Sequence, residues 1–161
     1  MDITPAALAQ STGTIPPCDL LLVEDNPLDL EIALRSFRKA GGAQHIQVAR
    51  DGAEALDFVF GEGRHAGRRL ADAPRMILLD LKLPKVDGLE VLARLKADER
   101  TRHIPVVMLT TSNQQRDLQR SYQLGVNSYL VKPVALEDFV QLARQVTAYW
   151  LGLNHALVAG S

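Results

Sequence analysis

The stretch "LLLVEDNPLDLE", residues 20–31, runs from four apolar residues into two adjacent acids and then a proline. A continuous apolar run of this length predicts a strand buried on both faces, as in a parallel sheet. Asn26 can cap a helix and Pro27 suits the first helical position, so a helix should begin directly after the strand. Glu24 and Asp25 therefore lie at the tip of the strand, where burial and mutual repulsion are costly.

Apolar runs and helical periodicity alternate along the rest of the chain. The predicted strands occupy 19–24, 45–49, 76–80, 104–111 and 127–132. The predicted helices occupy 27–40, 51–61, 87–98, 113–124 and 135–150, and the Gly- and Arg-rich segment 62–75 is predicted to be a loop. Strands that alternate with helices are joined by right-handed crossovers into one parallel sheet. We therefore expect an α/β fold with a single doubly wound, five-stranded parallel sheet.

The sequence predicts one folded domain with two short ends. A chain of 161 residues is long enough to bury one core, and it has no internal repeat. Residues 1–17 end in two prolines and are expected to form a flexible N-terminal extension. The domain should span 18–153, and 154–161 should form a C-terminal tail.

Composition excludes several classes of partner. Lys and Arg number 18 and Asp and Glu 19, so the chain lacks the basic excess that a nucleic-acid-binding surface normally shows. Its N-terminus has no basic segment before an apolar run, and no stretch approaches the ~20 apolar residues of a membrane span. Cys18 is the single cysteine, which favours a reducing compartment. We expect a cytoplasmic protein that binds neither nucleic acid nor membrane.

Charged and hydroxyl side chains follow the predicted strands at the point where each ends. Glu24, Asp25, Asp80, Thr110 and Lys132 should all meet at the carboxyl edge of the sheet, where open α/β sheets bind ligands. Two carboxylates ~4 Å apart repel by about 4 kcal/mol at an effective dielectric constant near 20. One lysine cannot neutralise three carboxylates, whereas a divalent cation together with the lysine would. An all-oxygen cluster of this kind suits Mg²⁺.

Four motifs resemble the signatures of the response-regulator receiver domain of two-component signalling. They are "LLLVEDN", "MILLDLKLPKVDG", "PVVMLTTS" and "NSYLVKP", which occur in order and with fitting separations across 19–150. The resemblance implies a flavodoxin-like sheet with strand order 2-1-3-4-5. It also implies that Asp80 is the phosphoacceptor, a role that suits a carboxylate nucleophile.

The resemblance assigns further roles residue by residue. Asp25 would ligate Mg²⁺ directly, Glu24 would help through water, and Asp80 and the backbone carbonyl of Lys82 would complete the protein ligands. Thr110 would bond the phosphoryl group and Lys132 would pair with it. Tyr129 would be the aromatic residue whose rotamer follows the switch. The bond between Lys132 and Pro133 would be cis.

The resemblance implies a stand-alone response regulator. Asp80 would accept a phosphoryl group from a partner histidine kinase in a Mg²⁺-dependent reaction, and the chain would catalyse only its own phosphorylation and dephosphorylation. Loop 62–75 and the segment "TAYWLGLN" (147–154) resemble the single-domain regulators that accompany bacterial phytochrome kinases. Apolar residues beyond the last helical stripe, among them Tyr149 and Leu153, favour a homodimer through the C-terminal helix region.

Output should then pass through conformational change and protein–protein contact. The helix 113–124 has few apolar residues, so it should be the least anchored, and Ser112 with Gln115 resembles a capping box at its start. Two alternatives remain open: a non-phosphorylated pseudo-receiver scaffold, and an intermediate that passes phosphoryl to a phosphotransfer protein. A phosphatase or nucleotide-binding enzyme is disfavoured, because the chain has no Walker-type glycine loop and no second acid two residues after Asp80.

Overall fold

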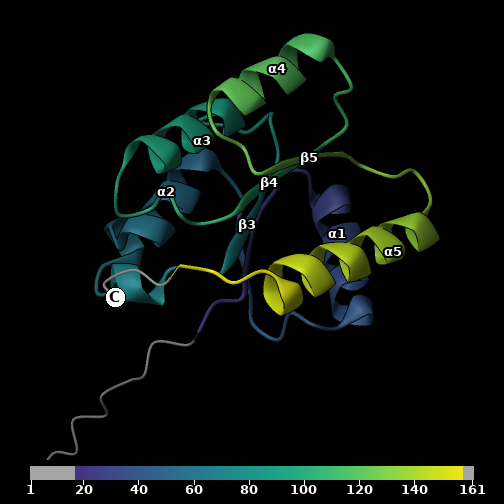
Figure 1. Ribbon diagram of the computed structural model, residues 1–161, viewed down its shortest axis with the longest axis horizontal. Helices are drawn as coiled ribbons and strands as arrows, with labels where there is room; N and C mark the ends of the chain where they lie inside the picture. The colour runs from purple at the N-terminus through teal and green to yellow at the C-terminus, as the bar shows by residue number, and fades with distance from the viewer. Residues whose placement is uncertain (1–16, 158–161) are drawn as a thin grey trace, which may run out of the picture.

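The computed structural model describes residues 17–157, so nearly all of the predicted extension at 1–17 and the end of the tail lie outside the described residues. The described chain alternates strands and helices as expected (Figure 1). The strands are β1 (Leu20–Val23), β2 (Ile46–Ala49), β3 (Met76–Leu79), β4 (Val106–Thr110) and β5 (Ser128–Val131). The helices are α1 (Pro27–Ala40), α2 (Gly52–Phe60), α3 (Gly88–Ala97), α4 (Gln115–Gln123) and α5 (Leu136–Thr147).

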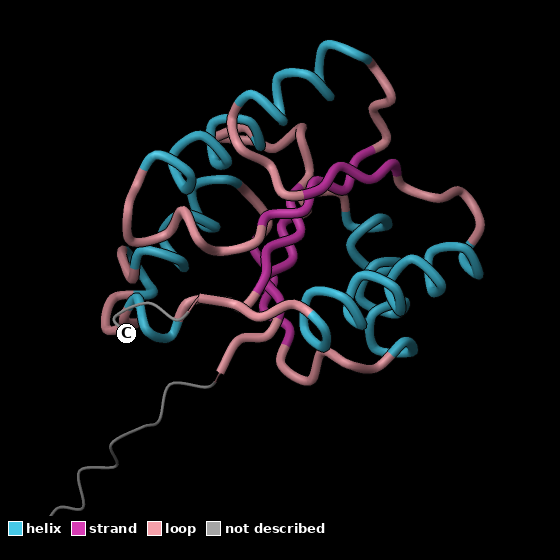
Figure 2. The backbone as a smooth tube through the Cα atoms, in the orientation of Figure 1, coloured by secondary structure: helices cyan, strands magenta, loops and turns pink. Residues whose placement is uncertain are grey.

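All five strands pair in parallel in the order β2-β1-β3-β4-β5, which confirms the predicted topology (Figure 2). Strand β1 lies between β2 and β3, with Leu20 opposite both Ile46 and Met76. The carboxyl ends of the strands consequently share one edge, and the order of the strands reverses direction beside β1. In open sheets this switch point is where ligands bind.

Alternate residues of each strand feed two separate apolar layers. Leu20 and Leu22 of β1 point toward α1 and α5, where Phe37 and Phe139 pack with them. Leu21 and Val23 point to the opposite face, which α2 and α3 cover. Figure 1 shows α1 and α5 on one side of the sheet and α2, α3 and α4 on the other. Because both faces are covered, the inner strands β1 and β3 are apolar and buried throughout, without the alternation expected of a half-exposed strand. The edge strands β2 and β5 are only partly buried and include Gln47 and Ser128.

Helix α1 begins and ends where its sequence predicts. The side-chain oxygen of Asn26 accepts hydrogen bonds from the backbone amides of Leu28 and Asp29, both at 3.0 Å. Gly41 takes a positive φ of 71° and its amide donates to the carbonyl of Phe37. The acid at the tip of β1 is therefore joined to a helix that starts two residues after Asp25.

Helix α4 begins later than predicted and has no capping box. The hydroxyl of Ser112 donates to Asp117, at 2.5 Å, and Gln114 takes the N-cap position without a side-chain hydrogen bond. The predicted partner Gln115 is thus the first helical residue rather than the third. The expectation that this helix buries little is confirmed, since Ser121 is its single buried residue.

The C-terminal helix continues past α5 as a π-helical segment, Ala148–Leu153. The amide of Asn154 donates to the carbonyl of Tyr149 at 2.6 Å, and Arg75 donates to the carbonyl of Leu151 at 2.8 Å. Segment 62–75, predicted to be a loop, contains the short 3₁₀ turns Gly63–His65 and Leu70–Asp72. Within the described residues, no helix combines the length and apolar character needed to cross a lipid bilayer.

Candidate functional site

Four strand ends bring their polar residues to one edge of the sheet. Glu24 follows β1, Asp80 follows β3, Thr110 ends β4 and Lys132 follows β5. Backbone hydrogen bonds of the sheet hold these positions. The amide of Asp80 donates to Val23 at 3.2 Å, and the amide of Lys132 donates to Thr110 at 2.8 Å. The placement of all four residues is therefore a direct result of strand register.

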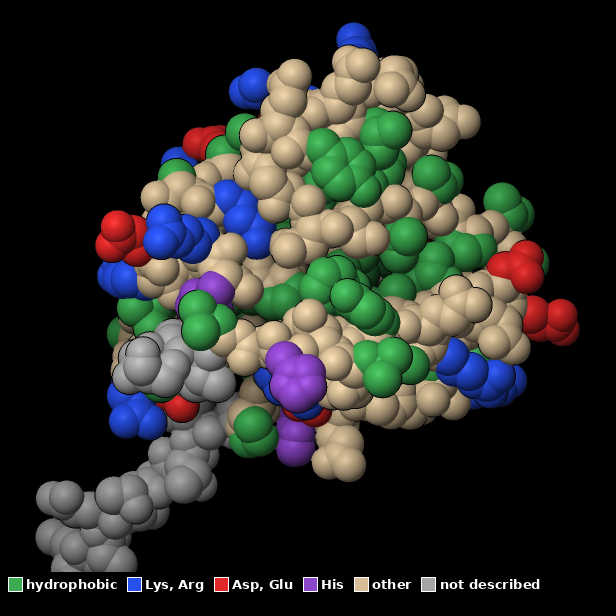
Figure 3. Space-filling view, in the orientation of Figure 1, with side chains coloured by type: hydrophobic (Ala, Val, Ile, Leu, Met, Phe, Trp, Pro, Cys, Tyr) green, Lys and Arg blue, Asp and Glu red, His purple; other side chains and the backbone are tan. Residues whose placement is uncertain are grey.

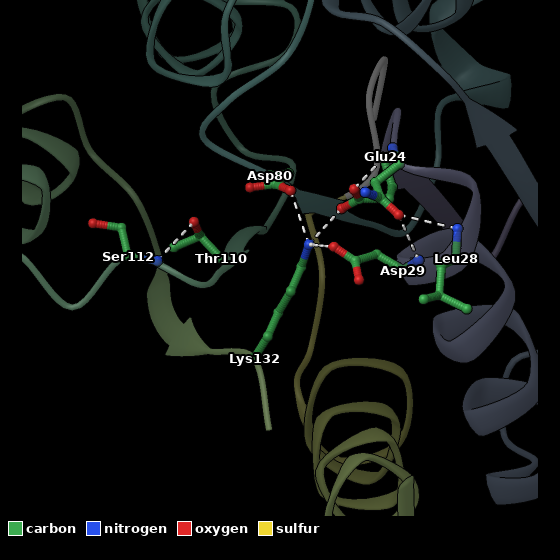
Figure 4. A network of polar contacts seen from close by, with 8 residues as sticks. Glu24, Leu28, Asp29, Asp80, Thr110, Ser112 and Lys132 are labelled. Carbon is green, nitrogen blue, oxygen red and sulfur yellow. Dashed lines mark hydrogen bonds and ion pairs between the residues drawn. The ribbon is translucent and has the colours of Figure 1, made fainter. Parts of the chain in front are cut away.

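The ammonium group of Lys132 is the centre of the site (Figure 4). Its Nζ lies 2.7 Å from Glu24 Oε2, 2.9 Å from Asp80 Oδ2 and 3.1 Å from Asp29 Oδ2. The side chain of Lys132 is 8% exposed, and those of Glu24 and Asp80 are 4% and 12% exposed. An ammonium group has three protons to donate, and here each has a carboxylate acceptor.

Burial and mutual repulsion shape the ionisation of this cluster. Burial, followed by the neighbouring Asp80, raises the pKa of Glu24 from 4.5 to about 7, and Lys132 offsets this only in part. Burial by itself would lower the pKa of Lys132. The hydrogen bonds to Glu24 and Asp80 outweigh burial and raise the pKa of Lys132 above its ordinary value. The site thus carries more negative than positive charge and favours a further cation.

The residues expected to bind a metal are only partly brought together. Glu24 and Asp80 converge on Lys132, whereas Asp25 is exposed. Within residues 17–157, no three His, Cys, Asp or Glu side chains are arranged as a metal site. The donors themselves suit a hard divalent cation, because Glu24, Asp25 and Asp80 offer carboxylate oxygens at one sheet edge. Lys132 bonds Glu24 and Asp80 and would have to release both before they could ligate a cation.

The loop after β3 holds Asp80 in place by close backbone packing. Gly88 approaches Asp80 so closely that an added Cβ would lie 2.0 Å from the carbonyl oxygen of Asp80. The amide of Gly88 donates to the carbonyl of Leu81 at 2.8 Å. Lys85 takes a positive φ of 66°, and its ammonium lies 3.2 Å from Asp51 at the start of α2. The side chain of Lys82 is exposed.

Thr110 and Tyr129 are connected through Ser112. The buried hydroxyl of Thr110 accepts a hydrogen bond from the Ser112 amide at 3.3 Å, and the Tyr129 hydroxyl donates to the Ser112 carbonyl at 2.9 Å. Both predicted switch residues therefore contact the segment that leads into α4. The bond between Lys132 and Pro133 is trans, so the expected cis bond was wrong. Trans is the lower-energy isomer for a bond before proline.

Asp29 is the site residue that the sequence did not indicate. Its position in the first turn of α1 predicted only a favourable interaction with the positive end of the helix dipole. A signal was nevertheless present. Asp29 follows Asn26 by three residues, so the first turn of α1 returns it to the same edge as Glu24.

The chain belongs to the response-regulator receiver family. The family model described as "Response regulator receiver domain" matches residues 20–144. The receiver resemblance and the flavodoxin-like fold inferred from sequence are both confirmed. Proteins of this family typically act in signalling without a separate enzymatic activity.

Two regulatory proteins of microorganisms are similar to the chain over most of its length. A probable methanogenesis regulatory protein, FilR2 of Methanothrix harundinacea, is 48% identical over 141 residues, which are 87% of this chain and 88% of that protein. Response regulator Rcp1 of Synechocystis sp. is 38% identical over 84% of this chain and 90% of its own.

Solved structures similar to the chain include response regulators of phytochrome systems. The Mn²⁺-bound form of Rcp1 superposes with a TM-score of 0.79 at 35% identity and covers 88% of this chain and all of its own. The phosphorylated cyanobacterial phytochrome response regulator RcpA has the same TM-score and identity, over 88% and 99% of the two chains. The bacteriophytochrome response regulator AtBRR is 46% identical, with a TM-score of 0.69 over 89% and 99%.

Proposed function

We propose that this chain is a stand-alone response regulator that accepts a phosphoryl group on Asp80 from a partner histidine kinase. The observation that carries the proposal is the pairing of Asp80 with the buried ammonium of Lys132 at 2.9 Å, at the switch point of the sheet. A carboxylate in this position is a nucleophile with a fixed cation beside it. The phosphorylated state of RcpA supports the same role for this chain.

In the proposed reaction, a carboxylate oxygen of Asp80 attacks the phosphorus of a phosphohistidine. The new O–P bond forms as the N–P bond of the donor breaks, and the imidazole leaves and takes a proton from solvent. Negative charge spreads over the equatorial oxygens of the phosphoryl group, where Lys132 can stabilise it. Hydrolysis by water later returns inorganic phosphate and the free carboxylate. We propose no other catalytic activity for the chain.

We propose Mg²⁺ as the resident cation, held by Glu24, Asp25, Asp80 and the backbone carbonyl of Lys82. When bound, it would supply positive charge beside the phosphoryl oxygens. The oxygen-only donor set and the excess negative charge of the site support this proposal. So does the divalent cation in the structure of Rcp1.

We propose that phosphorylation reaches α4 through Thr110 and Tyr129. The hydroxyl of Thr110 would turn from the Ser112 amide to a phosphoryl oxygen, and Tyr129 would then release the Ser112 carbonyl. Ser112 leads directly into α4, which buries little of its own surface. A segment with so few buried contacts is a suitable two-state element.

The partner kinase is proposed to be a bacteriophytochrome. AtBRR, at 46% identity over nearly its whole length, supports this assignment. Two alternative roles would treat the phosphoryl group differently. A pseudo-receiver scaffold would not accept one, and a phosphorelay intermediate would pass it on to a phosphotransfer protein. We propose a cytoplasmic location, because the single cysteine, Cys18, is a buried free thiol, which suits a reducing compartment.

We propose a homodimer through the C-terminal helix region. Figure 3 shows apolar side chains gathered on the face between α4 and α5. A groove of about 700 Å³ lies there between β5 and α5, and Leu130, Leu142, Val146, Tyr149 and Trp150 are among its lining residues. Tyr149 is 50% exposed and Leu153 73% exposed. Sedimentation experiments should show a dimer. Tyr149→Glu should convert it to a monomer, whereas the control Leu28→Glu, on α1, should leave it a dimer.

The proposed phosphorylation is tested by incubation with acetyl phosphate, with and without Mg²⁺. We expect mass spectrometry to show the gain of one phosphoryl group in the presence of Mg²⁺ and no gain for Asp80→Asn. Glu99→Gln, which replaces an exposed acid in the turn after α3, is the matched control and should be phosphorylated like the wild type. Gain of phosphate by Asp80→Asn would refute Asp80 as the acceptor.

A further inference from the structure

The third carboxylate on Lys132 comes from a helix rather than from a strand tip. Asp29 Oδ2 lies 3.1 Å from the ammonium, and its side chain is 37% exposed, against 4% for Glu24. Figure 4 shows Lys132 between Asp80 on one side and Glu24 and Asp29 on the other. Asp29 thus bonds the ammonium from the solvent-facing side of the site.

The position of Asp29 is fixed by the start of α1. Its amide donates to the side chain of Asn26 at 3.0 Å, and the amide of Asn26 donates to Glu24 Oε1 at 3.1 Å. Glu24, Asn26 and Asp29 are therefore linked by hydrogen bonds. These bonds fix the backbone of Asp29 beside the site, from which its carboxylate reaches Lys132.

We propose that Asp29 is a positioning residue that competes with the phosphoryl group for the ammonium of Lys132. This inference rests on the proposed function, in which Lys132 must bond a phosphoryl oxygen on Asp80. In the structure all three protons of Lys132 are engaged by carboxylates, so the ammonium that the phosphoryl group needs is already shared. Glu24 and Asp80 are proposed to bind a cation instead, whereas Asp29 is outside that set and keeps its bond to Lys132.

The net effect of Asp29 is competition, because Lys132 does not need it for orientation. The Lys132 side chain is 8% exposed, and its backbone amide is fixed to Thr110 in the sheet. What Asp29 adds is a negative charge on the same ammonium that an incoming phosphoryl dianion requires. Its removal should strengthen binding of a phosphoryl analogue.

Calorimetric titration with the beryllium trifluoride anion, in saturating Mg²⁺, tests this inference without any turnover. We expect Asp29→Asn to bind the anion about threefold to tenfold more tightly than the wild type, since a partly exposed charge is screened by solvent. Asp29→Glu restores the negative charge and should return the affinity to within about twofold of the wild type. Glu31→Gln, an exposed acid in the same helix that removes the same charge, should leave it unchanged.

Three outcomes separate this inference from the proposed function. Equal affinities of the wild type and Asp29→Asn would overturn the competition. Weaker anion binding by Asp29→Asn, accompanied by about a tenfold loss of Mg²⁺ affinity, would overturn it in favour of a metal ligand. Failure of the wild type itself to bind the anion in Mg²⁺ would instead refute the proposed function. Circular dichroism of each variant confirms that it is folded.

Discussion

The ammonium of Lys132 lies 2.9 Å from a carboxylate oxygen of Asp80, although 52 residues separate the two in sequence. Glu24 and Asp29 bond the same ammonium from 108 and 103 residues away. Lys132 therefore ties together β1, α1, β3 and the end of β5 at the functional edge of the molecule. This single cation governs the stability of the site as well as its chemistry.

Replacement of Lys132 by alanine should destabilise the protein strongly. The change leaves buried carboxylates without their counterion, which typically costs about 3 kcal/mol or more in the free energy of unfolding. Urea denaturation monitored by circular dichroism measures this cost. Lys85→Ala, which breaks an ion pair whose lysine is 69% exposed, is the control and should cost less than about 1 kcal/mol. Equal losses in the two variants would show that Lys132 contributes no more than a surface charge.

Stability of the metal-free protein should fall as pH rises. Folding raises the pKa of Glu24 from 4.5 to about 7, so the folded state holds an extra proton between these values. The stabilising contribution is complete below pH 4.5 and is lost as pH rises through 7, by about 3 kcal/mol. Denaturant titrations in EDTA at several pH values measure the slope. In Glu24→Gln this dependence should disappear, and an unchanged slope would assign it to another group.

A divalent cation should stabilise the protein through Asp25. Binding at one hundred times its dissociation constant adds about 2.7 kcal/mol to the free energy of unfolding. Asp25 is exposed, so Asp25→Asn should leave the metal-free protein almost as stable as the wild type. The variant should nevertheless lose most of the gain that Mg²⁺ provides, as followed by thermal denaturation. A full Mg²⁺ response in Asp25→Asn would remove this residue from the proposed metal ligands.

Replacement of Tyr129 by phenylalanine should loosen the segment that leads into α4. The variant loses the hydrogen bond to the Ser112 carbonyl, a contribution of about 1 kcal/mol. Amide hydrogen exchange across 111–124 should therefore become faster. Tyr122→Phe is the matched control, because Tyr122 is 55% exposed on α4 itself. Unchanged exchange in Tyr129→Phe would show that this hydrogen bond does not anchor the segment.

The sheet and its site edge were predictable because strand signals here are strong and local. The apolar runs ending at Glu24, Asp80 and Lys132 identify the strands, and parallel topology brings their ends together. The start of α4 was less predictable. Ser112 and Gln115 have the spacing of a cap, but the Ser112 hydroxyl bonds Asp117 instead. Local sequence cannot show whether a hydroxyl will accept from the N3 amide of the predicted helix or donate to a nearby carboxylate.

The first turn of α1 places Asp29 near Glu24, but its contact with Lys132 depends on long-range geometry. Its contact with Lys132 requires the crossover from β1 into α1 and the register of β5 at the other side of the switch point. The trans bond before Pro133 also differs from the family expectation. The exposed side chain of Asp25 depends on rotamer choice at a strand end, which the sequence leaves open.

The three carboxylate bonds of Lys132 mean that the resting protein already contains its own counter-cation. Binding of the proposed magnesium ion would then require Glu24 and Asp80 to release Lys132, which would stay in the site beside Asp29. The free energy of binding the ion would include the cost of breaking the bonds of Lys132 to Glu24 and Asp80. Lys132 would thus keep the carboxylates at this edge of the sheet paired in the metal-free protein.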